Sequence, residues 1–232
     1  MPTTILITGA NRGLGLEFTR QYAASGWRIF ACCRNPQTAD ALQQLKQQYA
    51  GNISLHALDV SDFQQIDLLA KALSGEKLDV LLNNAGIFPQ GKEAFGSVDY
   101  EAWMEAFRVN SMAPLKMAEA FIENLNLGQQ KKIISITSKM GSIDDNTSGH
   151  HYLYRSSKTA LNMVTKSLAI DLAPRGITAI VMHPGWVQTD MGGFSAPTTV
   201  QQSIAGMRQV IEHITPKDNG KFYAYDGKEI PW

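Results

Sequence analysis

The sequence predicts an α/β protein built on one doubly wound parallel sheet with helices on both faces. Short apolar runs rich in Val, Ile and Leu alternate along the chain with longer segments of helical periodicity. Continuously apolar strands are typical of parallel sheets that are buried on both faces, and strand–helix alternation builds such sheets. No repeat, low-complexity tract or change in composition divides the 232 residues. We therefore expect a single domain over residues 1–232.

The elements of this fold follow from the pattern in order. The short apolar runs predict strands at 4–8, 28–33, 53–58, 79–82, 132–137 and 177–182, with an edge strand within 220–232. The periodic segments between them predict helices at 16–22, 38–48, 63–73, 99–125, 154–172 and 200–211. The segment 99–125 is interrupted around Pro114, because proline lacks the N–H that a helix interior needs.

The overall charge and the cysteine content limit the partner and the compartment. The chain has 21 basic and 21 acidic residues, which gives no support for nucleic acid or an anionic membrane as the main partner. Cys32 and Cys33 are adjacent, so they point to opposite faces of a strand and a disulfide between them is disfavoured. Two reduced thiols, no signal-peptide pattern and no apolar stretch of bilayer length predict a cytoplasmic protein.

A glycine-rich turn joins the first strand to the first helix. Gly9 allows a tight turn, Gly13 lets the backbone approach a phosphate, and Gly15 lets helix and strand pack closely. The helix N-terminus then presents free N–H groups and a positive dipole end to that phosphate. Because strand, turn and helix follow one another directly, we interpret the turn as a dinucleotide-binding site.

The end of the second strand favours NADP(H). In NAD sites an acidic residue near this strand end accepts hydrogen bonds from the ribose 2′-hydroxyl, and here the position is Cys33. Arg34 follows it and offers a planar fork to a 2′-phosphate. Arg12 in the glycine turn adds a second cation on the same side. The alternative interpretation is that Arg34 is a solvated loop residue.

Tyr154 and Lys158 lie about one turn apart on the helix expected over 154–172. A free tyrosine titrates near about 10, so it is a poor proton donor or acceptor at neutral pH. A neighbouring lysine cation favours the phenolate, so we expect a lowered pKa for Tyr154 and a candidate general acid or base. The same spacing is also common on solvated helix faces, and its meaning depends on the rest of the chain.

Five separated signatures, in this order along the chain, resemble the short-chain dehydrogenase/reductase family. They are T-G-x-x-x-G-x-G at 8–15, N-N-A-G at 83–86, Asn110, the set Ser138, Tyr154 and Lys158, and P-G-x-V-x-T at 184–189. The loop before Tyr154 and the end of the chain are similar to the branch that contains C-factor and the sniffer carbonyl reductases. The resemblance covers nearly the whole chain and implies a Rossmann-type, NAD(P)-binding domain.

This resemblance implies that four residues carry the chemistry: Asn110, Ser138, Tyr154 and Lys158. Ser138 would hold the substrate carbonyl, and it matches better than Ser135 and Ser142 because it directly follows the strand. Tyr154 would donate a proton, while Lys158 would bind the nicotinamide ribose and lower the pKa of the tyrosine. Asn110 would distort its helix and anchor a water next to Lys158.

The resemblance also implies which residues hold NADPH or NADP+, with NADH less favoured. At the glycine turn and the second strand they are Gly9, Asn11, Arg12, Gly13, Leu14, Gly15 and Arg34. Along the rest of the sheet edge they are Asp59, Val60, Asn84, Ala85, Gly86, Tyr154, Lys158, Pro184, Gly185, Val187 and Thr189. Asp59 would contact the adenine, and Val187 and Thr189 would adjoin the nicotinamide. We interpret Asn83 as structural.

The function expected from these features is NADPH-dependent reduction of a ketone or aldehyde to an alcohol. The alternatives are an NAD-dependent alcohol dehydrogenase and a cofactor-sensing signalling protein of the C-factor type. Phe88, Trp186 and Phe194 suggest an apolar or aromatic small-molecule substrate. Residues 192–211, with glycine hinges before a short helix, are a candidate substrate lid.

Two further expectations concern the histidines and the assembly. We interpret His56 and His183 as packed residues and expect no metal site, because no second ligand stands at useful spacing from His56. The helices over 99–125 and 154–172 form dimer contacts in many members of the family. We therefore expect a homodimer or homotetramer.

Overall fold

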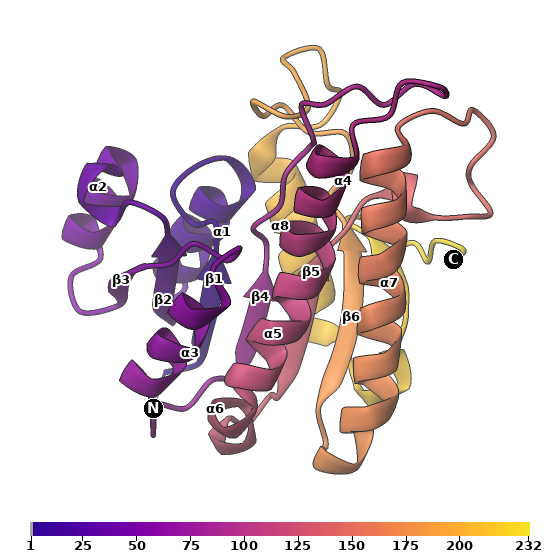
Figure 1. The fold of residues 1–232 in the computed structure, drawn as a ribbon. Coiled ribbons are helices and arrows are strands. Elements are labelled where there is room, and N and C mark those ends of the chain that lie inside the picture. Colours follow the sequence, from indigo (N-terminus) through magenta and orange to yellow (C-terminus); the bar gives the residue numbers. More distant parts are fainter. Residues whose placement is uncertain (1) are drawn as a thin grey trace.

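Within residues 2–232, which the computed structural model describes, seven strands form one sheet (Figure 1). They are β1 (Thr4–Thr8), β2 (Arg28–Cys33), β3 (Ile53–Ala57), β4 (Val80–Asn83), β5 (Lys132–Ile136), β6 (Thr178–His183) and β7 (Phe222–Ala224). Their order across the sheet is β3-β2-β1-β4-β5-β6-β7, and each neighbouring pair is parallel. This arrangement confirms the predicted doubly wound parallel sheet.

Helices connect the strands in the alternation that the sequence predicts. The longer ones are α1 (Gly13–Ala24), α2 (Asp40–Gln48), α3 (Phe63–Ala72), α4 (Tyr100–Phe107), α5 (Ala113–Ala120), α6 (Ile122–Leu127), α7 (Tyr152–Leu172) and α8 (Val200–His213). Short helical turns are η1 (Pro36–Thr38), η2 (Arg108–Met112), η3 (Lys139–Gly141), η4 (Ala173–Arg175) and η5 (Pro216–Asp218). No helix among residues 2–232 has both the length and the apolar character needed to cross a membrane.

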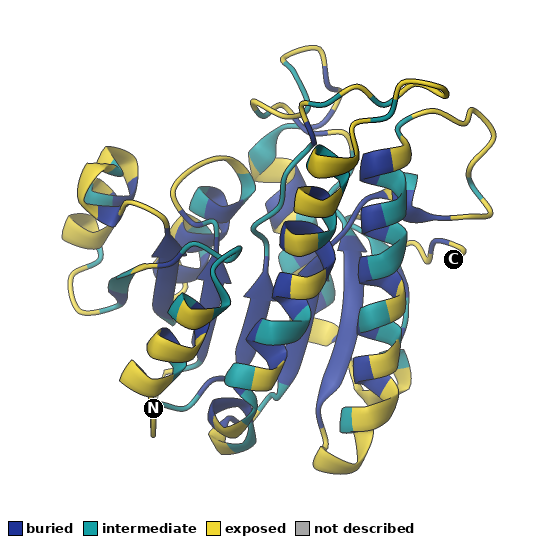
Figure 2. Cartoon of the chain, in the orientation of Figure 1, coloured by how far each residue is buried: buried dark blue, intermediate teal, exposed yellow. Residues whose placement is uncertain are grey.

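Alternate strand residues face two separate hydrophobic layers. Ile5 and Ile7 of β1 face the layer that α1, α2 and α8 cover, whereas Leu6 faces the layer of α3, α5, α6 and α7. Figure 1 shows α3, α5 and α7 on the near side of the sheet, and Figure 2 shows the strands buried behind them. Because strand side chains alternate with a period of two, one apolar run fills both layers.

The centre of the sheet holds the point where the strand order reverses. β1 and β4 are neighbours, with β2 and β3 on one side and β5 to β7 on the other. In doubly wound sheets, ligands bind at the carboxyl ends of the strands beside such a switch point. The turn at 9–15 follows β1 and the string at 83–86 coincides with the end of β4, so both motifs meet at this place.

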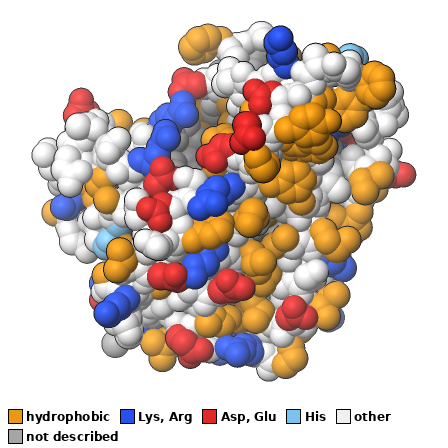
Figure 3. Space-filling view, in the orientation of Figure 1, with side chains coloured by type: hydrophobic (Ala, Val, Ile, Leu, Met, Phe, Trp, Pro, Cys, Tyr) orange, Lys and Arg blue, Asp and Glu red, His pale blue; other side chains and the backbone are white. Residues whose placement is uncertain are grey.

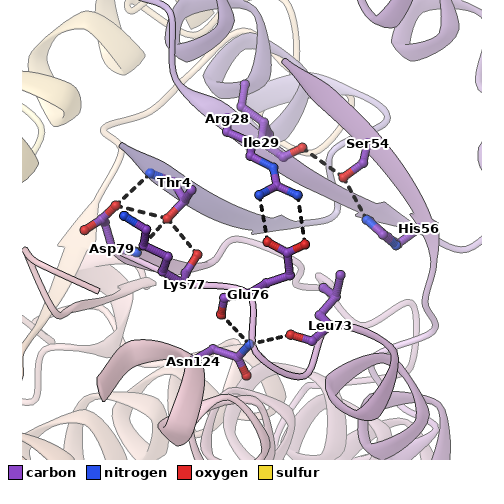
Figure 4. A network of polar contacts seen from close by, with 10 residues as sticks. All are labelled: Thr4, Arg28, Ile29, Ser54, His56, Leu73, Glu76, Lys77, Asp79 and Asn124. Carbon is purple, nitrogen blue, oxygen red and sulfur yellow. Dashed lines mark hydrogen bonds and ion pairs between the residues drawn. The ribbon is translucent and has the colours of Figure 1, made fainter. Parts of the chain in front are cut away.

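The amino ends of the strands are fixed by polar contacts (Figure 4). Asp79 accepts a hydrogen bond of 2.8 Å from the backbone N–H of Thr4. Arg28 donates to both carboxylate oxygens of Glu76, at 2.7 and 3.0 Å, and Asn124 donates to the Glu76 carbonyl at 2.7 Å. The buried polar groups of Thr4, Asp79 and Asn124 are thus paired, as buried polar groups in folded proteins generally are. The carboxyl edge, by contrast, carries the motifs that the sequence singles out.

The segment predicted as one interrupted helix over 99–125 consists of several pieces. α4 ends at Phe107, a π-helical turn covers Arg108–Met112, and α5 and α6 follow. Pro114 lies in the first turn of α5, where its missing N–H costs no hydrogen bond. The interruption therefore lies ahead of Pro114, in the turn that contains Asn110.

The last strand, β7, is the edge strand predicted within 220–232. The ring of Trp232 packs on Phe222 of this strand, with 5.7 Å between the ring centres. The apolar end of the chain thus covers the edge of the sheet. Exposed sheet edges invite pairing with other chains, and here residues 228–230 pair with β7: Ala224 donates to the Lys228 carbonyl and Ile230 to the Phe222 carbonyl, at 2.8 Å each.

Candidate active site

The glycine turn after β1 is packed so closely that Gly9 and Gly15 have little or no room for a side chain. Gly9 has a φ of +66°, which favours glycine. A Cβ atom on Gly15 would lie 2.1 Å from the Gly9 carbonyl oxygen and 2.6 Å from Nδ2 of Asn84. The turn can keep this shape only with glycine at position 15. These contacts agree with the packing role expected for Gly15.

The N-terminus of α1 opens onto the same turn. Arg12 is its N-cap residue and makes no capping hydrogen bond with its side chain, and the first turn of the helix holds no acidic residue. The first N–H groups of a helix lack partners within the helix and carry a positive partial charge. Asn11 is exposed and Leu14 is half-buried beside them. The turn therefore fits an anionic group such as a pyrophosphate.

Asn84, rather than Asn83, braces the turn. Its Nδ2 donates to the carbonyls of Thr8 and Gly9, at 2.8 and 3.2 Å. The hydroxyl of Thr8 in return accepts the backbone N–H groups of Asn84 and Ala85, at 3.0 Å each. Asn83 is buried, and neither atom of its side-chain amide has a partner within the described chain. The structural role that the sequence suggested for Asn83 thus belongs to its neighbour.

Asp59 and Val60 lie just beyond the carboxyl end of β3, at the side of the sheet expected for the adenine. Oδ1 of Asp59 accepts hydrogen bonds from the backbone N–H and the hydroxyl of Ser61, at 2.9 and 2.7 Å. This oxygen shapes the loop before α3. The other carboxylate oxygen is the one left for a ligand, because no hydrogen bond to it occurs within residues 2–232.

The two arginines proposed for a 2′-phosphate differ in their surroundings. Arg34 is exposed after β2, and no ion pair engages it among residues 2–232. Cys33 beside it is buried and unoxidised, as is Cys32. Arg12 instead donates through Nη1 to Asp190, at 2.6 Å. Arg34 is therefore the guanidinium that the structure leaves available at the end of β2.

Ser138, Tyr154 and Lys158 come together beside the carboxyl end of β5. Ser138 follows this strand closely, and Tyr154 lies in the first turn of α7. The Ser138 hydroxyl accepts the backbone N–H of Met140 at 3.1 Å and lies near enough to the phenol to oppose the rise of the Tyr154 pKa. Nζ of Lys158 lies 5.8 Å from the centre of the Tyr154 ring and donates to the Ile136 carbonyl at 3.0 Å. All three side chains are buried, so their hydrogen bonds act in a medium of low dielectric.

Burial controls the proton affinities of this cluster. It raises the pKa of Tyr154 to about 12, and the interaction with Ser138 opposes the shift. Burial also lowers the pKa of Lys158 to about 8. The expected lowering of the Tyr154 pKa is wrong, because desolvation of the phenolate dominates and Lys158 donates to a backbone carbonyl. At neutral pH the phenol therefore keeps its proton.

Asn110 lies in the π-helical turn η2 and is fully buried. Its Oδ1 accepts the backbone N–H of Ile87 at 2.9 Å, and its Nδ2 donates to the Ile87 carbonyl and to Ser157, at 3.0 Å each. A Cβ on Gly86 would lie 3.1 Å from Oδ1 of Asn110 and 3.3 Å from Nζ of Lys158. Asn110 thus ties the segment after β4 to α7, directly beside the lysine.

The comparison with known families decides the classification. The sequence model of the family described as short chain dehydrogenase matches residues 3–199. The chain belongs to the short-chain dehydrogenase family. It is accordingly an oxidoreductase, and its buried serine, tyrosine and lysine occupy the carboxyl edge of the sheet.

Similar proteins and solved structures indicate the branch of the family to which this short-chain dehydrogenase is most similar. C-signal of Myxococcus xanthus is 43% identical over 155 residues, which cover 67% of this chain and 93% of that protein. Among solved structures, the carbonyl reductase Sniffer of D. melanogaster superposes with a TM-score of 0.92 at 37% identity, with all of both chains covered. The NADPH-bound carbonyl reductase from chicken fatty liver gives 0.91 at 35% identity, again over both whole chains. These matches support the C-factor/sniffer-like branch.

The segment after β6 carries the remaining predicted cofactor contacts of the dehydrogenase. Gly185 has a φ of +86°, so the chain turns sharply after Pro184. Val187 is buried, and Thr189 lies against the glycine turn, where its Cγ2 would be 3.7 Å from a Cβ on Gly13. The segment therefore lies over the start of α1.

The three aromatic residues expected at the substrate differ in how far they are exposed and in whether they contact Tyr154. Phe88 packs on Tyr154 with 4.7 Å between the ring centres. Trp186 and Phe194 have 58% and 93% of their surface exposed, so in this structure they form no closed wall with Phe88. Nε1 of Trp186 donates to the Gly192 carbonyl at 2.7 Å. The aromatic contact to the phenol is thus made by Phe88.

The competing serines and the histidines have other surroundings. Ser135 lies inside β5, and Ser142 accepts the backbone N–H of Asp145 at 3.1 Å. Nε2 of His56 lies 2.9 Å from the Ser54 hydroxyl (Figure 4). His183 ends β6, and burial lowers its pKa to about 4, so it is neutral at pH 7. Both histidines are partly buried at the sheet, as expected for packed residues.

Sequence reasoning missed several residues that organise this site. Thr8 anchors Asn84, and Ser157 anchors Asn110. Glu93, in the loop after β4, lies 2.5 Å from Nδ1 of His151, in the loop before α7. Thr8 stands next to the glycine motif and could have been recognised as a capping hydroxyl. The other pairs join segments that are far apart in the chain, and no local pattern marks them.

Proposed function

We propose that this short-chain dehydrogenase reduces a ketone or aldehyde to the alcohol with NADPH. The observation that carries the proposal is the buried phenol of Tyr154, which keeps its proton at neutral pH beside the Ser138 hydroxyl. A protonated acid next to a second hydroxyl is suited to polarise a carbonyl oxygen and then protonate it. Carbonyl reductases among the similar solved structures support the same activity.

The fit of NADPH to the sheet edge rests on the glycine turn and on Arg34. Because Gly15 has no Cβ, the Gly9 carbonyl and the Asn84 side chain can pack against it and give the turn its shape. The start of α1 has no side-chain cap and suits a pyrophosphate. Arg34 is exposed and Cys33 replaces the acidic residue typical of NAD sites, so a 2′-phosphate would find a cation there and no repelling carboxylate. The NADPH-bound relative supports this choice.

When bound, NADPH would supply the hydride that reaches the carbonyl carbon. Ser138 and Tyr154 would donate hydrogen bonds to the carbonyl oxygen and so stabilise the charge that develops on it. Tyr154 would then transfer its phenolic proton to that oxygen, which completes the alcohol. Lys158 would hold the nicotinamide ribose hydroxyls, and its positive charge would stabilise the phenolate that remains.

Asn110 would position the water through which solvent returns a proton to the site. Its side chain is engaged by Ile87 and Ser157, which fixes the π-helical turn beside Lys158. We infer that this turn holds a water that connects Lys158 to solvent. A π-helical turn withdraws a backbone group from the regular helical pattern, and such turns are frequent at functional sites.

The substrate in this proposal is apolar or aromatic. Phe88 packs on the phenol, and Trp186 and Phe194 stand exposed on the segment over the glycine turn. Of the candidate lid over residues 192–211, α8 packs in the core through the buried Ile204, Met207 and Ile211, so residues 192–199 with Phe194 would be the part that closes over the substrate. The positive φ of Gly193, at +75°, supports a hinge at its start.

The proposed assembly is a homodimer or homotetramer in the cytoplasm. Tyr100, Met104 and Met163 are more than half exposed on α4 and α7. Figure 3 shows hydrophobic side chains gathered over this region. An exposed apolar patch of this kind is typical of a contact between subunits. The free thiols Cys32 and Cys33 suit a reducing compartment.

A signalling function is the second candidate, and the similarity to C-signal favours it. Such a protein would bind the dinucleotide without needing turnover. The NAD-dependent alcohol dehydrogenase remains a weaker alternative, because Arg34 favours a phosphate at the end of β2.

The experiment that separates these functions is a panel of ketones and aldehydes tested with NADPH and with NADH, followed by the loss of cofactor absorbance. The proposal expects oxidation of NADPH by at least one apolar or aromatic carbonyl compound, with NADH much slower. If NADPH binds but no compound of a broad panel oxidises it, the signalling function is favoured. Faster turnover with NADH would favour the NAD-dependent alternative.

A further inference from the structure

An ion pair joins two segments that lie far apart in the sequence, on opposite sides of the expected cofactor position. Nη1 of Arg12, the residue before α1, donates to Oδ2 of Asp190 at 2.6 Å. Asp190 lies in the connection from β6 to α8. Both side chains are about two-thirds or more exposed, at 68% and 73%. Within residues 2–232, this is the sole polar contact between the glycine turn (9–15) and residues 186–199.

Residues 186–199 form a compact unit that is held at its base. Val187 pairs with Thr198, and the backbone N–H of Gln188 donates to the Thr198 carbonyl at 3.0 Å. The base continues into α8, which packs in the same hydrophobic layer as α1. The tip, which includes Asp190, has its link to the body of the protein through Arg12. The ion pair is therefore the polar contact that holds the tip on the glycine turn.

The position of the tip is that of a cover over the start of α1. Thr189, the neighbour of Asp190, comes within 3.7 Å of a Cβ placed on Gly13. Gly13 begins α1, whose first N–H groups suit the pyrophosphate. A pyrophosphate at this helix end would lie beneath residues 189 and 190. Both NADPH and NADH carry that group, whereas the 2′-phosphate belongs to NADPH alone.

A guanidinium can serve the carboxylate and the phosphate together. It has five N–H donors and remains charged at all relevant pH values. In the structure Nη1 is used by Asp190, while Nε and Nη2 have no hydrogen-bond partner within the described chain. Arg12 can therefore bind Asp190 on one side and a phosphate oxygen on the other.

We propose that Arg12 and Asp190 form a clasp that holds residues 186–199 over the pyrophosphate and slows the release of either dinucleotide. This inference rests on the proposed function. It adds a role that serves both cofactors to the one expected for Arg12 at the 2′-phosphate, where Arg34 is the other cation. Asp190 is a positioning residue that acts through Arg12.

The test is the dissociation rate of bound NADPH and of bound NADH, followed by the fluorescence of the reduced nicotinamide after mixing with excess oxidised cofactor. For an exposed ion pair, Asp190→Asn should speed the release of both cofactors by a similar factor, roughly two- to five-fold. Asp190→Glu keeps the carboxylate and should restore slow release. Once Arg12 is replaced by Gln, Asp190→Asn should add little, because the partner is already gone.

Arg34→Gln is the matched control and should speed the release of NADPH alone. Unchanged or slower release in Asp190→Asn would overturn the clasp, and so would an effect of Arg12→Gln that is confined to NADPH. If neither dinucleotide binds the unaltered protein, the proposed function and the clasp fail together. If both bind and Asp190→Asn changes nothing, the clasp fails alone.

Discussion

Nζ of Lys158 lies 5.8 Å from the centre of the Tyr154 ring, and its hydrogen bond goes to the carbonyl of Ile136. Two groups that share one helix face are thus both buried and differently engaged. Because burial disfavours charge, the phenol is held neutral and the ammonium is held close to its titration range. The pair is arranged so that the tyrosine has a proton to give.

The pH dependence of cofactor use should follow Lys158. Its pKa is lowered to about 8, so the side chain is charged below this pH and neutral above it. If the charge is needed to hold the ribose and stabilise the phenolate, kcat/KM for NADPH should fall above about pH 8. Lys158→Arg keeps its charge and should remove this limb. Rates measured between about pH 6.5 and pH 10 test the assignment, and an unchanged limb in the arginine variant would contradict it.

Asn110→Ala should lower the free energy of unfolding by about 1–3 kcal/mol, because it empties a fully buried position and leaves the partly buried N–H of Ile87 without its partner. Urea titration measures the loss. The control is Asn126→Ala, since Asn126 is half-buried and its side chain makes one long, exposed hydrogen bond of 3.3 Å to Glu123. That change should cost less than about 0.5 kcal/mol. Equal losses in the two variants would show that the Asn110 network is not structural.

Gly15→Ala should disrupt the glycine turn. The added Cβ would meet the Gly9 carbonyl at 2.1 Å, so backbone must move. We expect a loss of stability of about 1–3 kcal/mol together with a loss of dinucleotide binding. Gly13→Ala is the matched variant, because its Cβ would contact only Thr189, at 3.7 Å. Its cost in stability would come from the positive φ of +52° alone. Thermal unfolding should rank Gly15→Ala as the more severe change, whereas cofactor titration should show weaker binding in both variants, because Gly13 is expected to let the backbone approach the phosphate.

Arg34→Gln should weaken NADPH binding and leave NADH binding unchanged. A charge-assisted hydrogen bond to a phosphate contributes about 1.5–3 kcal/mol, so the expected loss is roughly ten- to hundred-fold in Kd. Fluorescence titration with both cofactors measures it, and NADH serves as the internal control. An equal loss for the two cofactors would remove Arg34 from the 2′-phosphate site.

The parallel sheet could be predicted because each strand is a continuous apolar run followed by a turn signal. The helical segment expected over 99–125 was placed with its interruption around Pro114, whereas the structure breaks it at Asn110, where side-chain bonds to Ile87 and Ser157 support a π-helical turn. Those partners are 23 and 47 residues away in the chain, so no helical pattern reveals them. Local spacing therefore predicted the helical segment but not the place of its distortion, which only the resemblance to the family implied at Asn110.

The site was predicted in its members but not in all of its roles. Asn84 and Asn83 are neighbours with the same side chain, and only the three-dimensional fold decides which one reaches the glycine turn. The Tyr154 pKa was expected to fall because spacing alone reveals the lysine and not the extent of burial. The pairing of Arg12 with Asp190 spans 178 positions and depends on how the connection after β6 returns over β1.

The central claim is that Tyr154 delivers the proton, and the replacement Tyr154→Phe tests it most directly. The change removes the hydroxyl and keeps the ring that packs on Phe88. With a carbonyl compound that the unaltered protein reduces, NADPH oxidation should fall by at least about a hundred-fold, while the Kd for NADPH stays nearly the same. Turnover at the normal rate in Tyr154→Phe, with NADPH bound, would contradict the account.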